Sequence, residues 1–219
     1  MTTFPEPLLK HLAASRVVAG FSINQVEQAV PLARALLAGG VDVVELTLRT
    51  AAGLDAVKAI ADHVPEMVLG VGTILTPEQA VAVKSAGATF GVAPGMNPRV
   101  VRAAQEAGLP FAPGIANPSD LEAAIELGCR FVKFFPAEAA GGIRYLRSMS
   151  APYQHLGIKY FPLGGLNADN MVAYLKEANV PAIGGSWIVD NALVDAGDWA
   201  SLTARAAAVM QTLNQSFQS

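Results

Sequence analysis

The stretch Phe131-Val132-Lys133-Phe134-Phe135-Pro136 places one lysine inside an apolar, aromatic run that predicts a buried β-strand. Burying an ammonium among aromatic side chains is costly unless the charge is paired or neutralised. Burial also favours the neutral amine, which is the form that attacks carbonyl groups. Lys133 is therefore the first candidate for chemistry. The alternative is a lysine at a strand end whose side chain reaches water between helices.

Similar apolar runs alternate with Ala-rich helical patterns on both sides of this stretch. Several runs are apolar on both faces, as a parallel sheet covered by helices requires. Eight strand and helix units in 219 residues predict an α/β fold, a (β/α)8 TIM barrel with a short N-terminal helix at 7–14, in a single domain over residues 1–219. The predicted strands span 17–22, 42–46, 67–71, 89–93, 110–112, 130–135, 158–162 and 182–184.

Capping residues mark the predicted helices. Thr76-Pro77, Asn97-Pro98 and Asn117-Pro118 each place a capping side chain before a proline at the first helical position. An open, doubly wound sheet is the alternative fold, but it would want a glycine-rich turn after the first strand, and Gly20-Phe21-Ser22 is not one. The predicted helices include 25–37, 54–63, 77–86, 98–107, 118–127 and 168–178.

Composition excludes several classes of function. The net charge is −3 and the cationic residues are scattered singly, so we expect no nucleic acid partner. The N-terminus lacks a signal-peptide pattern and no apolar stretch is long enough for a membrane span, so we expect no membrane partner. The single Cys129 suits a cytoplasmic location. The histidines show no metal-ligand spacing, so we expect no metal and no cofactor.

The carboxylate most easily paired with Lys133 is Glu45. Val43, Glu45 and Thr47 share one strand face by the two-residue period, which places the carboxylate near the end of the second strand. In such barrels functional residues sit at the C-terminal ends of strands. An acid and an amine in one pocket suggest Schiff-base chemistry. The alternative is a buried ion pair with a purely structural role.

Arg49 and Thr73 follow the second and third strands, at the same end of the predicted barrel. A guanidinium can hold a carboxylate in bidentate fashion, and a hydroxyl can add a hydrogen bond. Together these residues could fix a 2-oxo acid. Arg49 could equally be an exposed loop charge, and Thr73 a turn residue.

Glycines end the last two strands, at Pro162-Leu163-Gly164-Gly165 and Gly184-Gly185-Ser186. Many barrels bind phosphate there through backbone N–H groups that only glycine lets a ligand approach closely. One glycine pair alone would indicate only a turn. Two pairs at these two positions favour a phosphate site.

Several motifs together resemble the 2-keto-3-deoxy-6-phosphogluconate aldolase and 4-hydroxy-2-oxoglutarate aldolase family, which are class I, pyruvate-dependent aldolases. The motifs cover nearly the whole chain from Val17 onward and occur in the family's order. They are Glu45-Leu46-Thr47-Leu48-Arg49-Thr50, Gly70-Val71-Gly72-Thr73, Val92-Ala93-Pro94-Gly95, Pro113-Gly114-Ile115, Lys133-Phe134-Phe135-Pro136-Ala137-Glu138 and Ile183-Gly184-Gly185-Ser186-Trp187.

The resemblance implies a role for each candidate residue. Lys133 would form the Schiff base and Glu45 would be the general acid and base. Arg49 and Thr73 would bind the pyruvate carboxylate. The remaining substrate-binding residues would be Pro94 and Phe135 around the imine, and Gly164, Gly165, Gly185 and Ser186 at a distal phosphate. It also implies a homotrimer, a keto-acid substrate and no metal.

Leu163 is a further candidate substrate-binding residue, and it departs from the family pattern, where a threonine usually precedes the two glycines. The expected reaction is reversible cleavage of 2-keto-3-deoxy-6-phosphogluconate to pyruvate and glyceraldehyde 3-phosphate, of 4-hydroxy-2-oxoglutarate to pyruvate and glyoxylate, or of both. Because Leu163 lacks a hydroxyl, an aldolase for the phosphogalactonate analogue or for another unphosphorylated acid stays open. Outside this class, the alternatives are a sugar-phosphate isomerase or epimerase and a barrel that binds a keto acid without catalysis.

Overall fold

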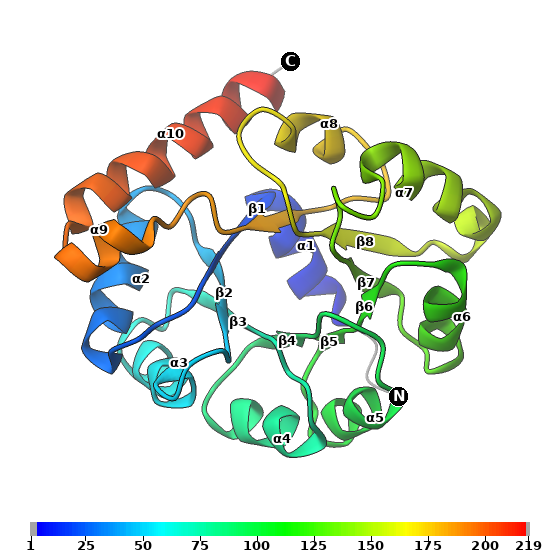
Figure 1. The fold of residues 1–219 in the computed structure, drawn as a ribbon, viewed down its shortest axis with the longest axis horizontal. Coiled ribbons are helices and arrows are strands. Elements are labelled where there is room, and N and C mark those ends of the chain that lie inside the picture. Colours follow the sequence, from blue (N-terminus) through cyan, green and yellow to red (C-terminus); the bar gives the residue numbers. More distant parts are fainter. Residues whose placement is uncertain (1–3, 218–219) are drawn as a thin grey trace.

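The computed structural model describes residues 4–217, in which helices form a ring around the strands (Figure 1). The strands are β1 (Val17–Phe21), β2 (Val43–Thr47), β3 (Val68–Gly72), β4 (Phe90–Val92), β5 (Phe111–Ala112), β6 (Gly114–Ile115), β7 (Phe131–Phe134), β8 (Lys159–Pro162) and β9 (Ile183–Gly185). The α-helices are α1 (Glu6–Ser15), α2 (Ala29–Ala38), α3 (Gly53–His63), α4 (Pro77–Ser85), α5 (Pro98–Glu106), α6 (Pro118–Glu126), α7 (Gly142–Ser150), α8 (Met171–Leu175), α9 (Asn191–Ala196) and α10 (Trp199–Phe217). Two 3₁₀ turns, η1 (Val26–Gln28) and η2 (Ala151–Leu156), complete the set.

The paired strands are parallel and form two sheets. One sheet has the order β5-β4-β3-β2-β1-β9, and the other has the order β6-β7-β8. An isolated parallel bridge joins Leu163, just after β8, to Gly184 in β9. The predicted α/β fold is confirmed. The hydrogen bonding, however, divides the strands into sheets of six and three instead of one continuous sheet of eight.

The predicted fifth strand, 110–112, is the one that differs most from expectation. The chain there forms β5 in the first sheet and β6 in the second, with Pro113 between them. Proline has no N–H to donate to a strand ladder, so it interrupts the pairing. Its carbonyl still accepts a hydrogen bond from the Lys133 N–H at 2.9 Å. The chain therefore passes from one sheet to the other at Pro113, directly beside Lys133.

Two predicted helices need correction. The helix expected at 25–37 begins with the 3₁₀ turn η1 and becomes α-helical only at Ala29. The helix expected at 168–178 is reduced to α8. The Asn167 side chain accepts hydrogen bonds from the N–H groups of Asp169 (2.8 Å) and Asn170 (3.3 Å). This local turn competes with the start of a helix, and α8 begins one residue later.

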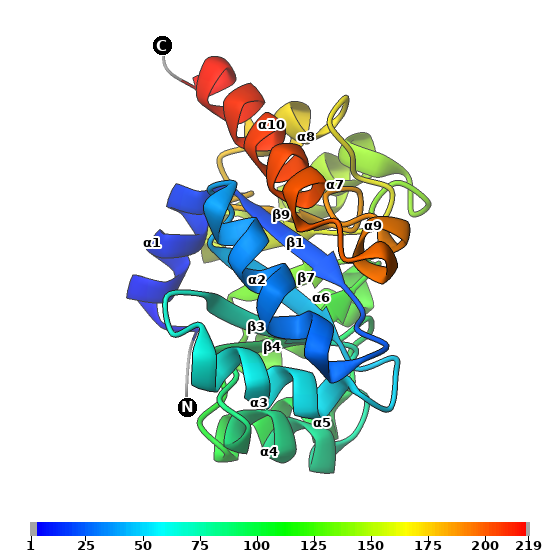
Figure 2. The ribbon, with the colours of Figure 1, turned by 90° about the vertical axis from the view of Figure 1, so that its left-hand side faces the viewer.

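The apolar core has two layers. Residues such as Leu36, Ile60 and Val83 fill the space between the sheets and the surrounding helices. A second cluster inside the strands contains Phe90 and Phe131, and the side chains of α1 pack against it. Figure 2 shows α1 on the side of the molecule opposite α9. The helix thus covers the end where the strands begin, and the opposite end is free for a site.

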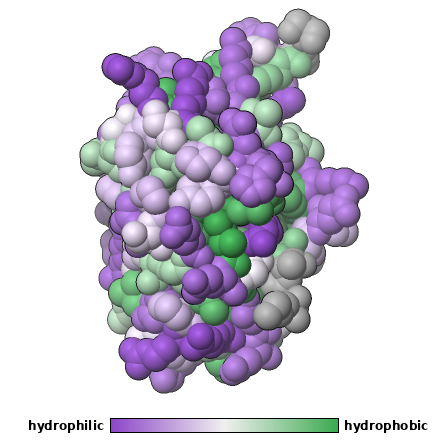
Figure 3. Space-filling view, turned by 90° about the vertical axis from the view of Figure 1, so that its right-hand side faces the viewer, coloured by the Kyte–Doolittle hydropathy of each residue, from purple (hydrophilic) through white to green (hydrophobic). Residues whose placement is uncertain are grey.

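The molecular surface is largely polar. On the face that carries α6, hydrophilic side chains surround a limited hydrophobic area (Figure 3). The exposed large hydrophobic side chains among residues 4–217 are Leu54, Leu75 and Val81, around α3 and α4. Every helix that the structure describes is too short or too polar to span a lipid bilayer.

Candidate active site

Lys133 and Glu45 meet inside the ring of strands. Lys133 lies in β7 and Glu45 in β2, and Lys133 Nζ donates to Glu45 Oε1 at 3.0 Å. Their side chains are 6% and 2% exposed, respectively. Lys133 Nζ also lies 5.1 Å from the centre of the Phe135 ring, within the range of a cation–π contact. The pair is buried, paired and next to an aromatic wall.

Space for the Glu45 carboxylate depends on Gly72, the last residue of β3. A Cβ atom at position 72 would overlap Glu45 Oε1 and lie 2.8 Å from the carboxyl carbon. The Glu45 carboxylate therefore fits beside β3 only because position 72 has no side chain.

The two residues expected at a substrate carboxylate are neighbours. Arg49 Nε donates to Thr73 Oγ1 at 3.4 Å, although 24 residues separate them. Thr73 adopts a φ of 61°, a left-handed conformation that is uncommon for a threonine. Arg49 is exposed and lines the cavity described below, whereas Thr73 and Pro94 are not among its lining residues.

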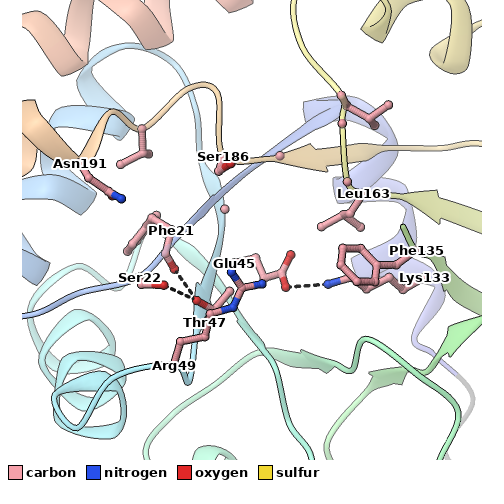
Figure 4. Close-up of a pocket in the computed structure, with 16 residues that line it drawn as sticks. Phe21, Ser22, Glu45, Thr47, Arg49, Lys133, Phe135, Leu163, Ser186 and Asn191 are labelled. Atoms are coloured by element: carbon pink, nitrogen blue, oxygen red, sulfur yellow. Dashed lines mark hydrogen bonds and ion pairs between the residues drawn. The ribbon is translucent and has the colours of Figure 1, made fainter. Parts of the chain in front are cut away.

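The cavity above the Lys133–Glu45 pair has a volume of about 440 Å³ (Figure 4). It opens at the C-terminal ends of the strands, where barrels carry their sites. Its lining residues are Gly20, Phe21, Ser22, Glu45, Thr47, Arg49, Lys133, Phe135, Leu163, Gly164, Gly165, Leu166, Gly185, Ser186, Val189 and Asn191.

The glycine-rich strand ends form one wall of this cavity. Gly164 and Gly165 adopt φ values of 95° and 82°, which favour glycine. The carbonyls of Leu163 and Gly164 accept hydrogen bonds from the N–H groups of Ala137 (2.7 Å) and Glu138 (3.0 Å). Among residues 4–217, none accepts a hydrogen bond from the N–H of Gly165. This arrangement suits an anion, because the carbonyls are engaged elsewhere and the Gly165 N–H is available.

Several polar cavity residues were not identified from the sequence as site residues. Ser22 Oγ lies 2.7 Å from Thr47 Oγ1, and the Thr47 hydroxyl is also 3.2 Å from the Phe21 carbonyl. Thr47 shares the strand face of Glu45, and this alternation could have identified it. Ser22 directly follows β1, and Asn191 is the first residue of α9; no motif surrounds either residue. Residues 4–217 contain no cluster of three or more His, Cys, Asp or Glu side chains placed to hold a metal.

The fold and the paired lysine and carboxylate are those of a class of α/β enzymes that handle carbonyl substrates. The family model described as KDPG and KHG aldolase matches residues 8–205, and the chain belongs to this family. KDPG and KHG stand for 2-keto-3-deoxy-6-phosphogluconate and 4-hydroxy-2-oxoglutarate. The family is one of carbon–carbon lyases, as the motifs predict.

Individual relatives agree with this assignment. The chain is 40% identical over 204 residues to the 2-dehydro-3-deoxy-phosphogluconate aldolase of Treponema pallidum, covering 93% of this chain and 96% of the relative. It is 41% identical over 192 residues to the KHG/KDPG aldolase of Escherichia coli K12, covering 88% and 89%. A structure of the KDPG aldolase of Legionella pneumophila, with pyruvate captured as a covalent carbinolamine, matches with a TM-score of 0.87 and 37% identity, covering 92% and 97%.

Proposed function

We propose that this protein reversibly cleaves 2-keto-3-deoxy-6-phosphogluconate into pyruvate and glyceraldehyde 3-phosphate through an imine on Lys133. The observation that carries the proposal is the buried contact of 3.0 Å between Lys133 Nζ and Glu45 Oε1 at the floor of the cavity. The family membership and the carbinolamine in the Legionella relative support the same chemistry.

Imine formation needs a neutral amine and a proton shuttle. Glu45 takes a proton from the Lys133 ammonium, and the freed lone pair attacks C2 of the substrate ketone. Glu45 passes this proton to the carbonyl oxygen, which gives the carbinolamine. Glu45 then transfers a second proton from the adduct nitrogen to the same oxygen, which leaves as water and gives the iminium. Glu45 is close enough to Lys133 to serve both transfers without a relay.

Carbon–carbon cleavage uses the iminium as an electron sink. Glu45 takes the proton of the C4 hydroxyl, the C4–O bond becomes a carbonyl, and the C3–C4 electron pair moves into the iminium. The products of this step are the aldehyde and an enamine on Lys133. Protonation of C3 and attack of water on C2 release pyruvate and return the free amine. The cleavage therefore requires no external oxidant or reductant.

We assign the two ends of the substrate to opposite parts of the site. Arg49, supported by Thr73, would hold the pyruvate carboxylate, and Pro94 and Phe135 would flank the imine. The N–H groups of Gly164, Gly165, Gly185 and Ser186 would receive the phosphate. The available N–H group of Gly165 supports this direction of binding.

A second candidate substrate follows from Leu163. Its apolar side chain is 6% exposed and packs over Gly184, where a threonine would offer a hydroxyl. An aldolase for the phosphogalactonate analogue or for unphosphorylated 4-hydroxy-2-oxoglutarate would fit such a wall. Comparison of kcat/KM for the three substrates decides between them. Equal values for phosphorylated and unphosphorylated acids would contradict the phosphate assignment.

We also infer the architecture around the site. The two sheets would act as one closed eight-stranded barrel and a single domain over residues 1–219, because the Gly114 N–H reaches the Gly95 carbonyl (3.3 Å) on one side and the Leu163–Gly184 bridge lies on the other. A homotrimer would cover the exposed Leu54, Leu75 and Val81. Chromatography with light scattering should give three times 22.7 kDa. A cytoplasmic location suits the single, unpaired Cys129.

Trapping the imine tests the proposed function. Incubation with pyruvate and sodium borohydride should add a pyruvate-derived mass, and peptide mapping should place it on Lys133. Lys159, whose Nζ donates to the Ala178 carbonyl on the surface, is the internal control and should stay unmodified. A folded Lys133→Met variant should neither trap pyruvate nor release it. Trapping elsewhere, or activity in this variant, would refute the mechanism.

A further inference from the structure

Glu138 and Tyr174 form a hydrogen-bonded pair behind the glycine wall of the cavity. The Tyr174 hydroxyl, on α8, donates to Oε1 of Glu138, which follows β7. Tyr174 is 1% exposed, whereas Glu138 is exposed, and neither residue lines the cavity. Any effect of the pair on the site must therefore be transmitted through the cavity-lining residues that Glu138 or Tyr174 contacts.

Glu138 touches the Gly164–Gly165 turn twice. Its N–H donates to the Gly164 carbonyl at 3.0 Å. Its side chain lies against Gly165, because a Cβ atom there would come within 2.7 Å of Glu138 Cβ and 2.9 Å of Cγ. The Asn170 side chain also holds Gly165, because it donates to the Gly165 carbonyl at 3.1 Å. The turn is thus fixed from behind by Glu138 and Asn170.

A carboxylate beside this turn is unfavourable for a bound phosphate unless it is held away. Two like charges at short range repel each other, and the repulsion is strong where water is partly excluded. The Glu138 carboxylate is on an exposed and rotatable side chain, so without a partner it could turn toward the cavity. Burial and the contact with Glu138 raise the pKa of the Tyr174 hydroxyl, which therefore stays protonated and able to donate at neutral pH.

We propose that Tyr174 is a positioning residue for the phosphate end of the site: its hydroxyl holds the Glu138 carboxylate behind the Gly164–Gly165 turn. The N–H groups of the turn then meet a phosphate without a competing anion. This inference rests on the proposed function and adds a determinant of phosphate preference outside the cavity lining.

Removing the hydroxyl tests this role. In Tyr174→Phe we expect KM for 2-keto-3-deoxy-6-phosphogluconate to rise about tenfold, because the freed Glu138 carboxylate repels the phosphate, while kcat changes less than about twofold. KM for unphosphorylated 4-hydroxy-2-oxoglutarate should rise much less, because its distal group is a carboxylate at C5, which carries less charge than a phosphate and lies three bonds nearer to C4. In the double variant Tyr174→Phe with Glu138→Gln, KM for the phosphorylated substrate should return to within about twofold of wild type, because the released side chain carries no charge.

Matched variants separate positioning from general damage. Tyr153→Phe removes a similar hydroxyl, which donates to Glu122 at a distance of 2.7 Å. Tyr153 does not line the cavity, so this variant should leave both kcat and KM unchanged. Glu138→Gln alone keeps an acceptor for Tyr174 and should leave KM for the phosphorylated substrate within about twofold of wild type. Circular dichroism of each variant establishes folding.

The outcomes distinguish this inference from the proposed function. Equal losses for both substrates in Tyr174→Phe, or no recovery in the double variant, would assign Tyr174 a purely structural role and overturn the inference. A tenfold rise of KM in Glu138→Gln alone would also overturn it. If wild-type protein failed to trap pyruvate with borohydride, the proposed function itself would be refuted. Trapping with no phosphate preference would overturn the inference alone.

Discussion

Gly72 shows how one missing side chain shapes the reactive centre. A Cβ atom at position 72 would occupy the place of Glu45 Oε1. We predict that Gly72→Ala pushes the carboxylate away from Lys133 and lowers kcat about 100-fold, because a displacement of about 1 Å is enough to misalign a proton transfer. Steady-state measurement of pyruvate release from the phosphorylated substrate checks this.

Gly95→Ala is the matched control for this variant. A Cβ atom at Gly95 would have no neighbour within 4 Å, so the substitution should leave kcat unchanged. Thermal unfolding of both variants separates a local effect from loss of the fold. Wild-type kcat in Gly72→Ala would contradict the role of Glu45 as proton shuttle.

The sequence predicts individual site residues unevenly. Glu45 and Lys133 stand out because a charge in an apolar strand is unusual, and the two-residue period assigns its face. The hydrogen bond between Ser22 and Thr47 joins residues 25 positions apart, and hydroxyl groups are common wherever chains turn. No local pattern identifies such a pair. The hydrogen bond between Ser22 and Thr47 forms only because β1 and β2 pair in the sheet.

At the scale of the element, the start of α4 carries a capping box. Gln79 N–H donates to Thr76 Oγ1 at 3.3 Å, and the Thr76 N–H donates to the Gln79 side chain at 3.1 Å. We predict that Thr76→Ala lowers the free energy of unfolding by about 1 kcal/mol, because a helix N–H loses its acceptor. Urea unfolding followed by circular dichroism measures the change.

Thr76→Ser is the conservative counterpart of that variant. It keeps the hydroxyl acceptor and should lose less than half as much stability. Neither substitution touches the cavity, so pyruvate release should be unchanged in both. Equal unfolding free energies for wild type and Thr76→Ala would show that the capping box contributes nothing here.

Elements with strong end signals are predicted well, and those without them are not. The prolines after Thr76, Asn97 and Asn117 mark the first residues of α4, α5 and α6, as expected from the sequence. In contrast, α7 begins at a glycine pair: Gly141 directly precedes the helix and Gly142 is its first residue, with φ values of 115° and 66°. A glycine pair signals a turn, so the helix behind it was not predicted. The short β5 and β6 likewise depend on Pro113, whose effect on pairing is tertiary.

At the scale of the whole molecule, the interior is divided into a filled half and an open half. Phe131 stacks on Phe161 with ring centres 5.7 Å apart, and α1 covers the end behind them. His11 and Ser15 of α1 both contact the Asp42 carboxylate, at 2.8 and 2.7 Å. The apolar half therefore closes one end, so a substrate enters at the other end, beside Lys133.

Cys129 links global stability to alkaline pH. Its thiol is 8% exposed, and burial raises its pKa from 9.0 to about 11, against a smaller opposing effect of Arg130. Between these pH values the unfolded chain loses the thiol proton while the folded chain keeps it, so the folded state binds more protons. We predict that the free energy of unfolding falls as pH rises from 9 to 11, by at most about 1.4 kcal/mol per pH unit. Urea unfolding at pH 8, 9, 10 and 11 measures the slope.

Cys129→Ala isolates this contribution. The variant loses the thiol but keeps Tyr160, whose pKa burial raises to about 12 and which adds a slope of the same sign at the upper end of the range. Tyr160 is present in both proteins, so its contribution cancels in the comparison. The difference in slope between wild type and variant should therefore be largest near pH 10, midway between the ordinary and the raised pKa of the thiol. The small cavity left by the sulfur lowers stability equally at every pH and does not affect the slope. Identical slopes in the two proteins would show that the thiol keeps its ordinary pKa in the folded chain.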